Sequence, residues 1–266
     1  MPKIDWRDAR AAQPDDLGLT RRGAMATGFA AFTVCALLAE VSCARPARSM
    51  PARTWIDRQA ELARALRKGE VLPLAWMTEV TRLAGEIDVA ELMAEVDRAK
   101  VSAVALSSTN DPAKRSIRFV DENGEPRRLG FAAALFDFTP GNVITPHGHS
   151  NMVSSHLVVK GQFRVRNFDR IGDEAGAMII RPSRDYIAGP GDLSAMSSAK
   201  DNIHWFVPHA GAAQTFDVII SGIDAALPDY AIQAIDPLGG QHRADGSIKA
   251  PLMGFADASI KYTAAL

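Results

Sequence analysis

The stretch Gly141-Asn-Val-Ile-Thr-Pro-His147-Gly-His149 decides the fold that the sequence predicts. Side chains two positions apart share one face of a β-strand, so His147 and His149 can point at one metal ion. A third imidazole, His204, lies far downstream in another β-rich run. Residues so distant in sequence meet around one point when strands form a closed or double-sheet barrel. The sequence therefore predicts a metal-binding β-barrel with His147, His149 and His204 as ligands.

Short runs of alternating apolar residues surround this stretch. From about residue 116 they are broken by glycine, proline, asparagine and aspartate, which are typical of turns. The runs recur at a spacing of roughly 8 to 12 residues, which favours a sandwich or barrel over alternating α/β structure. We therefore expect a mainly β domain over residues 108–266, with Asp121-Glu-Asn-Gly124 as a hairpin turn.

Residues 45–107 have a different pattern, with runs rich in alanine, leucine, glutamate and arginine at 55–68, 74–83 and 89–100. Glycine and proline separate these runs, which predict three helices. Asp88 is the expected N-cap of the third helix. We interpret this helical segment first as a brace on the outside of the barrel, and second as a lid or a dimer element.

Residues 1–44 are typical of an export signal. Thr20-Arg21-Arg22 precedes an uncharged run from Gly23 to Ala39, and the small residues Ser42-Cys43-Ala44 follow. The uncharged run is at the short limit for a membrane span. We expect a cleaved signal of the twin-arginine type, a periplasmic or secreted protein, and no stable membrane insertion after cleavage. An uncleaved anchor and a lipid anchor at Cys43 are the alternatives.

Composition limits the partners and the metal ligands. The formal net charge is -1, and no dense block of lysine and arginine is present, so we expect no nucleic-acid binding. Cys35 and Cys43 are the only cysteines, and both lie in the predicted signal. Any metal of the mature chain must then use nitrogen and oxygen ligands. We expect a small-molecule partner, and a homodimer stays open.

The motifs around the histidines resemble those of the cupin family. Gly141, His147-x-His149 and Gly161 are similar to the first cupin motif, and Gly189-Pro190-Gly191-Asp192 with His204 is loosely similar to the second. The resemblance covers about residues 130–236 and is strongest to the thiol dioxygenase branch, in particular cysteamine and plant N-terminal cysteine dioxygenases. The motifs shared with that branch are Pro146-His-Gly-His149, Asn202-Ile203-His204 and Phe216-Asp217-Val218.

This resemblance implies a cupin double-stranded β-helix (jelly-roll) barrel that follows the helical segment. It also implies a mononuclear non-haem iron held by His147, His149 and His204, with open positions for substrate and O₂. Asp217 would lie where those enzymes keep an acidic group beside the metal ligands. Neutral nitrogen ligands also suit Mn, Ni, Cu and Zn, so Fe(II) is favoured by the resemblance and not by the ligand type.

Two departures from the family pattern affect the site. The generic cupin has a glutamate ligand on the strand after the histidine pair, and Ser154 stands at that place. His156 shares a strand face with Ser154 and could be a fourth ligand, an acid/base group, or a core histidine satisfied by a serine hydroxyl. Cysteine dioxygenases proper also use a cysteine–tyrosine crosslink, which a mature chain without cysteine cannot form.

Other polar side chains have weaker signals. Each ligand ring needs a hydrogen bond at its second nitrogen, for which the candidates are Asp217, Asn202 and Asn151. An inward arginine could grip a carboxylate, although the row Arg164, Arg166 and Arg170 is more typical of a solvated face. We expect His209 and His242 to be structural or surface residues in loops.

Two functions follow from these patterns. The first is an exported metal-dependent dioxygenase-like enzyme acting on a small molecule, in which His156 or Asp217 handles a proton. The second is a non-oxidative cupin, either a metal-dependent isomerase or lyase or a small-ligand-binding module. The missing glutamate and the export signal keep this second function open.

Overall fold

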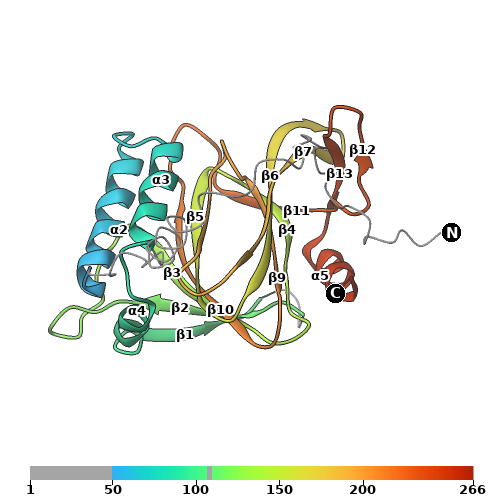
Figure 1. Cartoon of the computed structure of the whole chain (residues 1–266). Coiled ribbons are helices and arrows are strands. Elements are labelled where there is room, and N and C mark those ends of the chain that lie inside the picture. Colours follow the sequence, from blue (N-terminus) through green and yellow to red (C-terminus); the bar gives the residue numbers. More distant parts are fainter. Residues whose placement is uncertain (1–49, 107–109, 266) are drawn as a thin grey trace, which may run out of the picture. The chain divides into compact units, whose positions relative to one another are not determined.

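Two antiparallel β-sheets face each other in this computed structural model, and helices cover the outer face of one of them (Figure 1). The structure describes residues 50–106 and 110–265, all within the unit Pro46–Leu266. The predicted export signal lies outside the described residues, and the predicted division at residues 107 and 108 stays a prediction. Across these two ranges, every helix is too short or too polar to span a bilayer.

Four helices and thirteen strands are present in the described residues. The helices are α2 (Ala52–Arg67), α3 (Pro73–Ala84), α4 (Val89–Val96) and α5 (Phe255–Ala264). The strands are β1 (Lys100–Val104), β2 (Ala113–Arg118), β3 (Ala132–Phe138), β4 (Ile144–Ser150), β5 (Met152–Lys160), β6 (Phe163–Glu174), β7 (Ala177–Ala188), β8 (Leu193–Met196), β9 (Ile203–Pro208), β10 (Ala213–Ser221), β11 (Ala231–Ile235), β12 (Gln241–His242) and β13 (Ile248–Met253).

The order of the strands identifies the fold. One sheet has the order β1-β2-β3-β10-β5-β8 and the other the order β11-β4-β9-β6-β7-β13-β12. From β3 to β10 the chain passes from sheet to sheet, except at the β6–β7 hairpin. The resulting orders β3-β10-β5-β8 and β4-β9-β6-β7 are those of a jelly roll, the double-stranded β-helix. The predicted mainly β barrel with an N-terminal helical segment is thereby confirmed.

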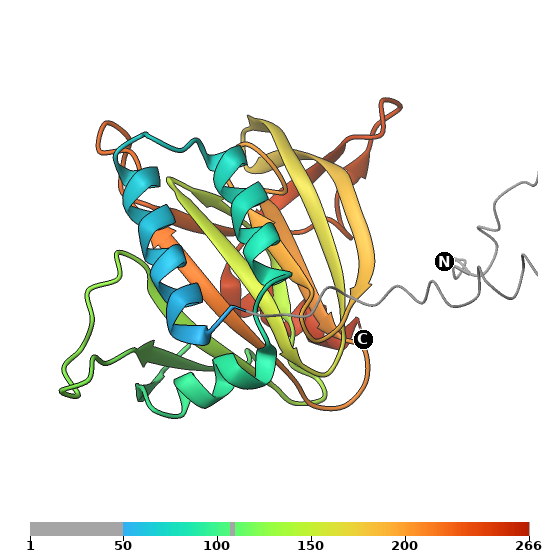
Figure 2. The ribbon, with the colours of Figure 1, turned by 60° about the vertical axis from the view of Figure 1, so that its left-hand side comes forward.

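Helices α2 and α3 lie against the outer face of the six-stranded sheet (Figure 2). Trp55 and Trp76 are at most 1% exposed and pack with outward residues of β5 and β10. The Trp55 indole N–H also donates to the Leu83 carbonyl at 3.0 Å. A buried contact of this kind is consistent with the interpretation of the segment as a brace.

The third predicted helix is shorter than its sequence pattern. Asp88 caps α4 as expected, because its Oδ1 accepts the backbone N–H groups of Ala90 and Glu91 at 2.7 and 3.2 Å. The helix ends at Val96, however, and the residues from Lys100 to Val104 pair with β2 as an edge strand. The prediction of helix up to residue 100 was wrong because strand pairing with a distant segment overrides local helix preference.

Alternation along β5 and β10 sends successive side chains to opposite faces. Phe216 and Val218 face the helices, whereas Asp217 lies between them in sequence and faces the other sheet. On β5, Leu157 faces the helices and His156 faces inward. The barrel interior therefore carries polar groups on the face of these strands opposite the apolar layer under the helices.

Gly161 shows why one motif glycine is needed. It lies in the turn between β5 and β6 with φ +71°, and a Cβ there would come within 2.8 Å of both the Ala212 carbonyl and the Ala213 Cβ. A larger residue would have both a strained backbone and a steric clash. This glycine thus sets how closely the β5–β6 turn approaches β10.

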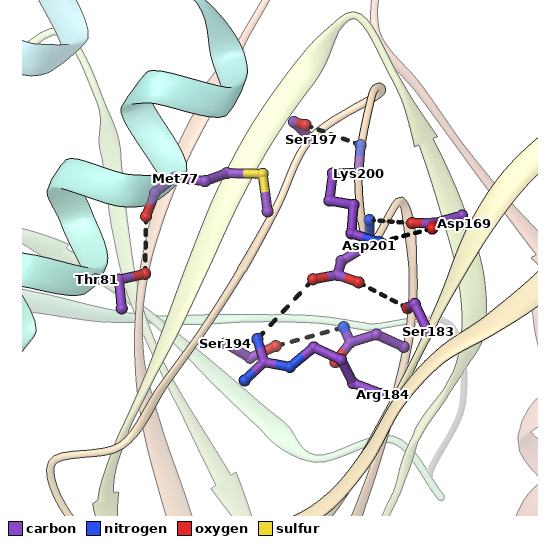
Figure 3. Close-up of polar contacts among 10 residues, drawn as sticks. Met77, Thr81, Asp169, Ser183, Arg184, Ser194, Ser197, Lys200 and Asp201 are labelled. Atoms are coloured by element: carbon purple, nitrogen blue, oxygen red, sulfur yellow. Dashed lines mark hydrogen bonds and ion pairs between the residues drawn. The ribbon is translucent and has the colours of Figure 1, made fainter.

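The turn before β9 is held by a polar network (Figure 3). Asp201, with φ 49°, accepts the Ser183 hydroxyl at 2.6 Å and donates its backbone N–H to Asp169 at 2.8 Å. Lys200 forms an ion pair with the same Asp169 carboxylate at 2.7 Å. These contacts fix the start of the strand that carries His204.

The C-terminal residues close the seven-stranded sheet on itself. Strand β11 pairs with both β4 and β13, and β13 pairs with β7. The strands β11, β4, β9, β6, β7 and β13 thus form a ring. Helix α5 packs on this ring through Tyr262, whose ring lies 4.9 Å from that of Trp205. The sequence analysis predicted neither β13 nor α5.

Candidate metal centre

Three imidazoles from two neighbouring strands meet inside the barrel. His147 and His149 lie on β4, and His204 lies on β9 directly opposite His147 in the register. The ring centroids are 4.7 Å apart for His147 and His149, 4.3 Å for His147 and His204, and 5.1 Å for His149 and His204. One ligand atom of each side chain lies within 4.8 Å of the others. The structure brings the three predicted residues together in a group that could hold a metal ion.

The ring orientations leave one nitrogen of each imidazole available. The Nδ1–H group of each ring donates to a nearby acceptor, which is the Thr145 carbonyl at 2.8 Å for His147, the Met152 thioether at 3.0 Å for His149, and the Met196 thioether at 2.6 Å for His204. Each Nε2 therefore carries a lone pair. The Nε2 atom of His149 is buried without a hydrogen-bond partner, which fits a metal ligand.

The hydrogen-bond partners predicted for the second nitrogens of these rings were wrong. Asn202 contacts the backbone of His149, donating its amide N–H to the carbonyl at 2.8 Å. Asn151 donates to the carbonyls of Asp224 and Pro228. Asp217 is a partner of His156 and not of a ligand ring. Thioether acceptors were missed because methionine in a barrel is usually read as an apolar core residue.

Burial keeps these imidazoles neutral. Desolvation lowers the pKa of His147 to about 4. It also lowers the pKa of His149 and His204 well below the ordinary value of 6.5, and neighbouring imidazoles lower both further. Only the neutral ring offers a lone pair to a cation, so all three residues are ready to bind a divalent metal at pH 7.

His156 faces the same space from the opposite sheet. Its ring centroid lies 4.6 Å from that of His204. Its Nδ1–H donates to the Asp217 carboxylate at 2.7 Å, and its Nε2 accepts the Ser154 hydroxyl at 3.0 Å. Of the three roles left open for His156, these contacts disfavour the fourth ligand, because both ring nitrogens already have partners.

A cavity of about 420 Å³ opens onto the four imidazoles. Ser154 and Asp217 also line it, and apolar side chains from both sheets form much of the remaining wall. None of its lining residues comes from α2, α3 or α4. These helices act on the site only through the sheet that they support.

The arginine row lies outside this cavity. Arg164 pairs with Asp185 at 2.8 Å and is 48% exposed, while the Arg166 guanidinium lies 4.1 Å from the Trp205 ring centroid. Arg164 fits the interpretation as a solvated face, whereas the Arg166 side chain is only 23% exposed, and no member of the row lines the cavity. His209 and His242 are exposed as expected, although His242 belongs to β12 and not to a loop.

One cavity residue that the sequence analysis did not single out is Lys114. It lies on β2, opposite Phe136 of β3, and both side chains line the cavity. Its strand is short and half exposed, so alternation alone did not distinguish an inward lysine from a solvated one. Its pairing with Phe136 of β3 is what shows that the Lys114 side chain lies on the inner face of the sheet.

The chain has distant structural similarity to solved proteins but no match in sequence. No protein-family model matches it, and neither does any curated protein. Similar structures include procruciferin, an 11S globulin from Brassica napus, with 11% identity, a TM-score of 0.34, and coverage of 48% of this chain but only 28% of that protein. Another is oxalate oxidase in complex with the substrate analogue glycolate, with 19% identity, a TM-score of 0.33, and coverage of 49% of this chain and 59% of the oxidase.

A sugar phosphate isomerase of the cupin superfamily from Silicibacter pomeroyi has 16% identity and a TM-score of 0.36, with coverage of 60% of this chain and 92% of the isomerase. All of these similarities are remote, and no activity follows from them. The fold assignment rests on the strand order, and the site rests on its own geometry.

Proposed function

We propose that this chain is a cupin-type, metal-dependent oxygenase, dioxygenase-like in its chemistry, that acts on a small molecule. One observation carries the proposal. Three imidazoles offer ligand atoms within 4.8 Å of one another beside a cavity of about 420 Å³, and the Nε2 of His149 is buried there without a hydrogen-bond partner. His147, His149 and His204 are the proposed ligands.

A divalent ion held by these three residues, Fe(II) in this proposal, would supply Lewis acidity and redox chemistry for a substrate and O₂. The protein supplies the surroundings. Phe136, Ile219 and Phe255 line the cavity with apolar groups that exclude water and strengthen electrostatic contacts inside it. Mn, Ni, Cu and Zn suit the same nitrogen ligands, so metal content decides among them.

His156 and Asp217 handle the proton in this proposal. The Asp217 carboxylate holds the Nδ1–H of His156, so that Nε2 is the basic nitrogen on the cavity side. A thiol or enol that binds beside the histidines transfers its proton toward this Nε2, directly or through the Ser154 hydroxyl. The imidazolium that forms lies against a carboxylate, which stabilises it.

Oxygen consumption tests the proposal. The protein is purified after natural export, analysed for metal, then loaded anaerobically with Fe(II) and mixed with O₂ and a panel of thiols and small enols. We expect O₂ uptake that His204→Ala abolishes and His209→Ala leaves intact. A fully loaded protein that consumes no O₂ with any member of the panel contradicts the oxygenase.

A non-oxidative cupin is the second candidate. Ser154 stands where the generic cupin has a ligand glutamate, and its hydroxyl is bound to His156 instead of pointing freely at the histidines. Such a site suits a metal-dependent isomerase or lyase, or a module that only binds a small ligand. Turnover without O₂ favours the former, and ligand binding that survives chelation favours the latter.

We also propose that the chain is exported, in keeping with the twin-arginine-type pattern of residues 1–44. A reporter fused after residue 44 should reach the periplasm. Replacement of Arg21 and Arg22 by lysine should block that transport, and unchanged export of the double variant would contradict a twin-arginine route.

A further inference from the structure

Lys114 is the one cationic side chain among the residues that line the cavity in the described ranges 50–106 and 110–265. Its ammonium lies 5.4 Å from the ring centroid of Phe136, its cross-strand partner. Across residues 50–106 and 110–265, no carboxylate forms an ion pair with Lys114, whose ammonium lies over the Phe136 ring. The ammonium is therefore available to a ligand.

The next residue along β2 shows the contrast. Arg115 points to the opposite face of the strand, where it forms two hydrogen bonds with Asp137 at 2.7 and 2.9 Å. Its charge is already neutralised by a protein carboxylate. Lys114, one position earlier, keeps its charge for the cavity.

The cavity lining also holds two carboxylates, Asp111 and Asp217. Asp217 holds the Nδ1–H of His156 and forms no ion pair with Lys114. Apolar side chains form much of the cavity lining, so an ion pair formed inside the cavity is stronger than one formed in water. The end of the cavity near β2 thus favours an anion.

Strand register places this cation relative to the histidines. Lys114 pairs with Phe136, and Ala134, which shares a face with Phe136, pairs with Asp217, the partner of His156. Lys114 thus lies on the inner face of the same sheet as His156, three strand spacings across the sheet and two residues along it, which together amount to roughly 16 Å. A lysine side chain covers part of that span, and a substrate of several atoms covers the rest.

We propose that Lys114 binds the anionic end of the substrate, and that the cavity takes a small acid whose other end lies against the three histidines. This inference rests on the proposed function, because it uses the same cavity. It assigns the substrate class as an anion, such as a carboxylate, and it makes Lys114 a specificity-determining residue.

Two thiols of equal length test the charge preference. Protein loaded with Co(II) is titrated with mercaptohexanoate and with mercaptohexanol, and thiolate-to-cobalt absorption gives each dissociation constant. We expect the acid to bind about tenfold more tightly than the alcohol, in keeping with a hydrogen bond to a charged group. Lys114→Met should remove this difference without weakening the alcohol, and Lys114→Arg should keep most of it.

Arg118→Met is the matched control, since it removes an exposed positive charge from the same strand outside the cavity. It should leave both dissociation constants unchanged. A preference for the acid that persists in Lys114→Met overturns the proposal. So does an equal loss of acid and alcohol binding, because that result indicates a structural role.

Hexanoate on metal-free protein separates this inference from the metal site. Its binding is followed by the NMR signals of Phe136 in the wild type and in Lys114→Met. We expect saturable shifts in the wild type that the variant lacks. If neither thiol ligates cobalt but these shifts are present, the metal proposal fails and the anion-binding role of Lys114 is upheld. Equal shifts in the wild type and in Lys114→Met overturn that role.

Discussion

The two walls of the barrel use the same side chain in different ways. On the seven-stranded sheet, the Nδ1–H groups of His147, His149 and His204 donate to a carbonyl or a thioether, and their Nε2 atoms are left for a ligand. On the six-stranded sheet, His156 is bound at both nitrogens, one of them by a carboxylate. Hydrogen-bond partners, more than residue type, therefore separate the proposed metal ligands from the proposed proton carrier.

The largest effect should come from replacing one of the three proposed ligand histidines of the seven-stranded sheet. His204→Ala removes the ligand from β9, and we expect metal affinity to fall by more than about 100-fold, beyond the loss caused by outer partners of a ligand. Inductively coupled plasma analysis after dialysis against a metal buffer measures this. His156→Ala and His209→Ala should keep the metal, and a loss in His156→Ala as large as in His204→Ala would erase the difference between the walls.

A change on the six-stranded sheet should lower the stability of the protein and leave its metal affinity unchanged. Asp217→Ala leaves the buried Nδ1–H of His156 without its acceptor, which costs about 1 to 3 kcal/mol in the free energy of unfolding. Urea unfolding of the metal-free protein gives this value. Metal affinity should hold, and Asp229→Ala, an exposed carboxylate, is the control that should change neither quantity.

Lowering the pH should reduce the free energy of unfolding of the metal-free protein, because the proposed ligand histidines of the seven-stranded sheet are buried. The pKa of His147 is about 4 in the folded chain and near 6.5 in the unfolded chain, so only the unfolded chain gains this proton as the pH falls below 6.5. The stabilising contribution is complete above pH 6.5 and is lost toward pH 4, at about 1.4 kcal/mol per pH unit for each such group. Urea unfolding midpoints measured between pH 4 and pH 6.5 test this prediction. His147→Gln should make the stability depend less steeply on pH.

The smallest effect should come from the thioether that orients His204. Met196→Leu conserves volume but removes the acceptor of the Nδ1–H. Because a thioether is a weak acceptor, we expect metal affinity to fall by less than about tenfold. Met178→Leu is the matched control, since Met178 is also buried but no ligand ring donates to it. Identical affinities for both variants would show that the thioether has no orienting role.

The parts of the site that the sequence predicted depend on local rules. Alternation along a strand placed His147 and His149 on one face, and it placed His156 on the inner face with Ser154. The cap at Asp88 also follows a local rule, because its acceptor and donors lie within three residues. Such features need no knowledge of the distant chain.

The parts that sequence could not supply depend on pairing between remote segments. The inward face of Lys114 follows from its register with β3, and the acceptor for His204 is Met196 on the facing sheet. Strand β13 was missed because Lys249 and Pro251 interrupt its apolar pattern, and its pairing with β7 and β11 is nonlocal. Nothing in a single sequence encodes these registers directly.

The ring of strands gives the residues from Ala231 onward a protective role. Strand β11 covers the edge of β4 along the residues that include His147 and His149. A fragment ending before Ala231 would leave that edge with unpaired N–H and C=O groups, a template for another chain. Shortened versions of this protein should therefore self-associate through the very strand that carries two of the imidazoles, so fusion partners belong after α5.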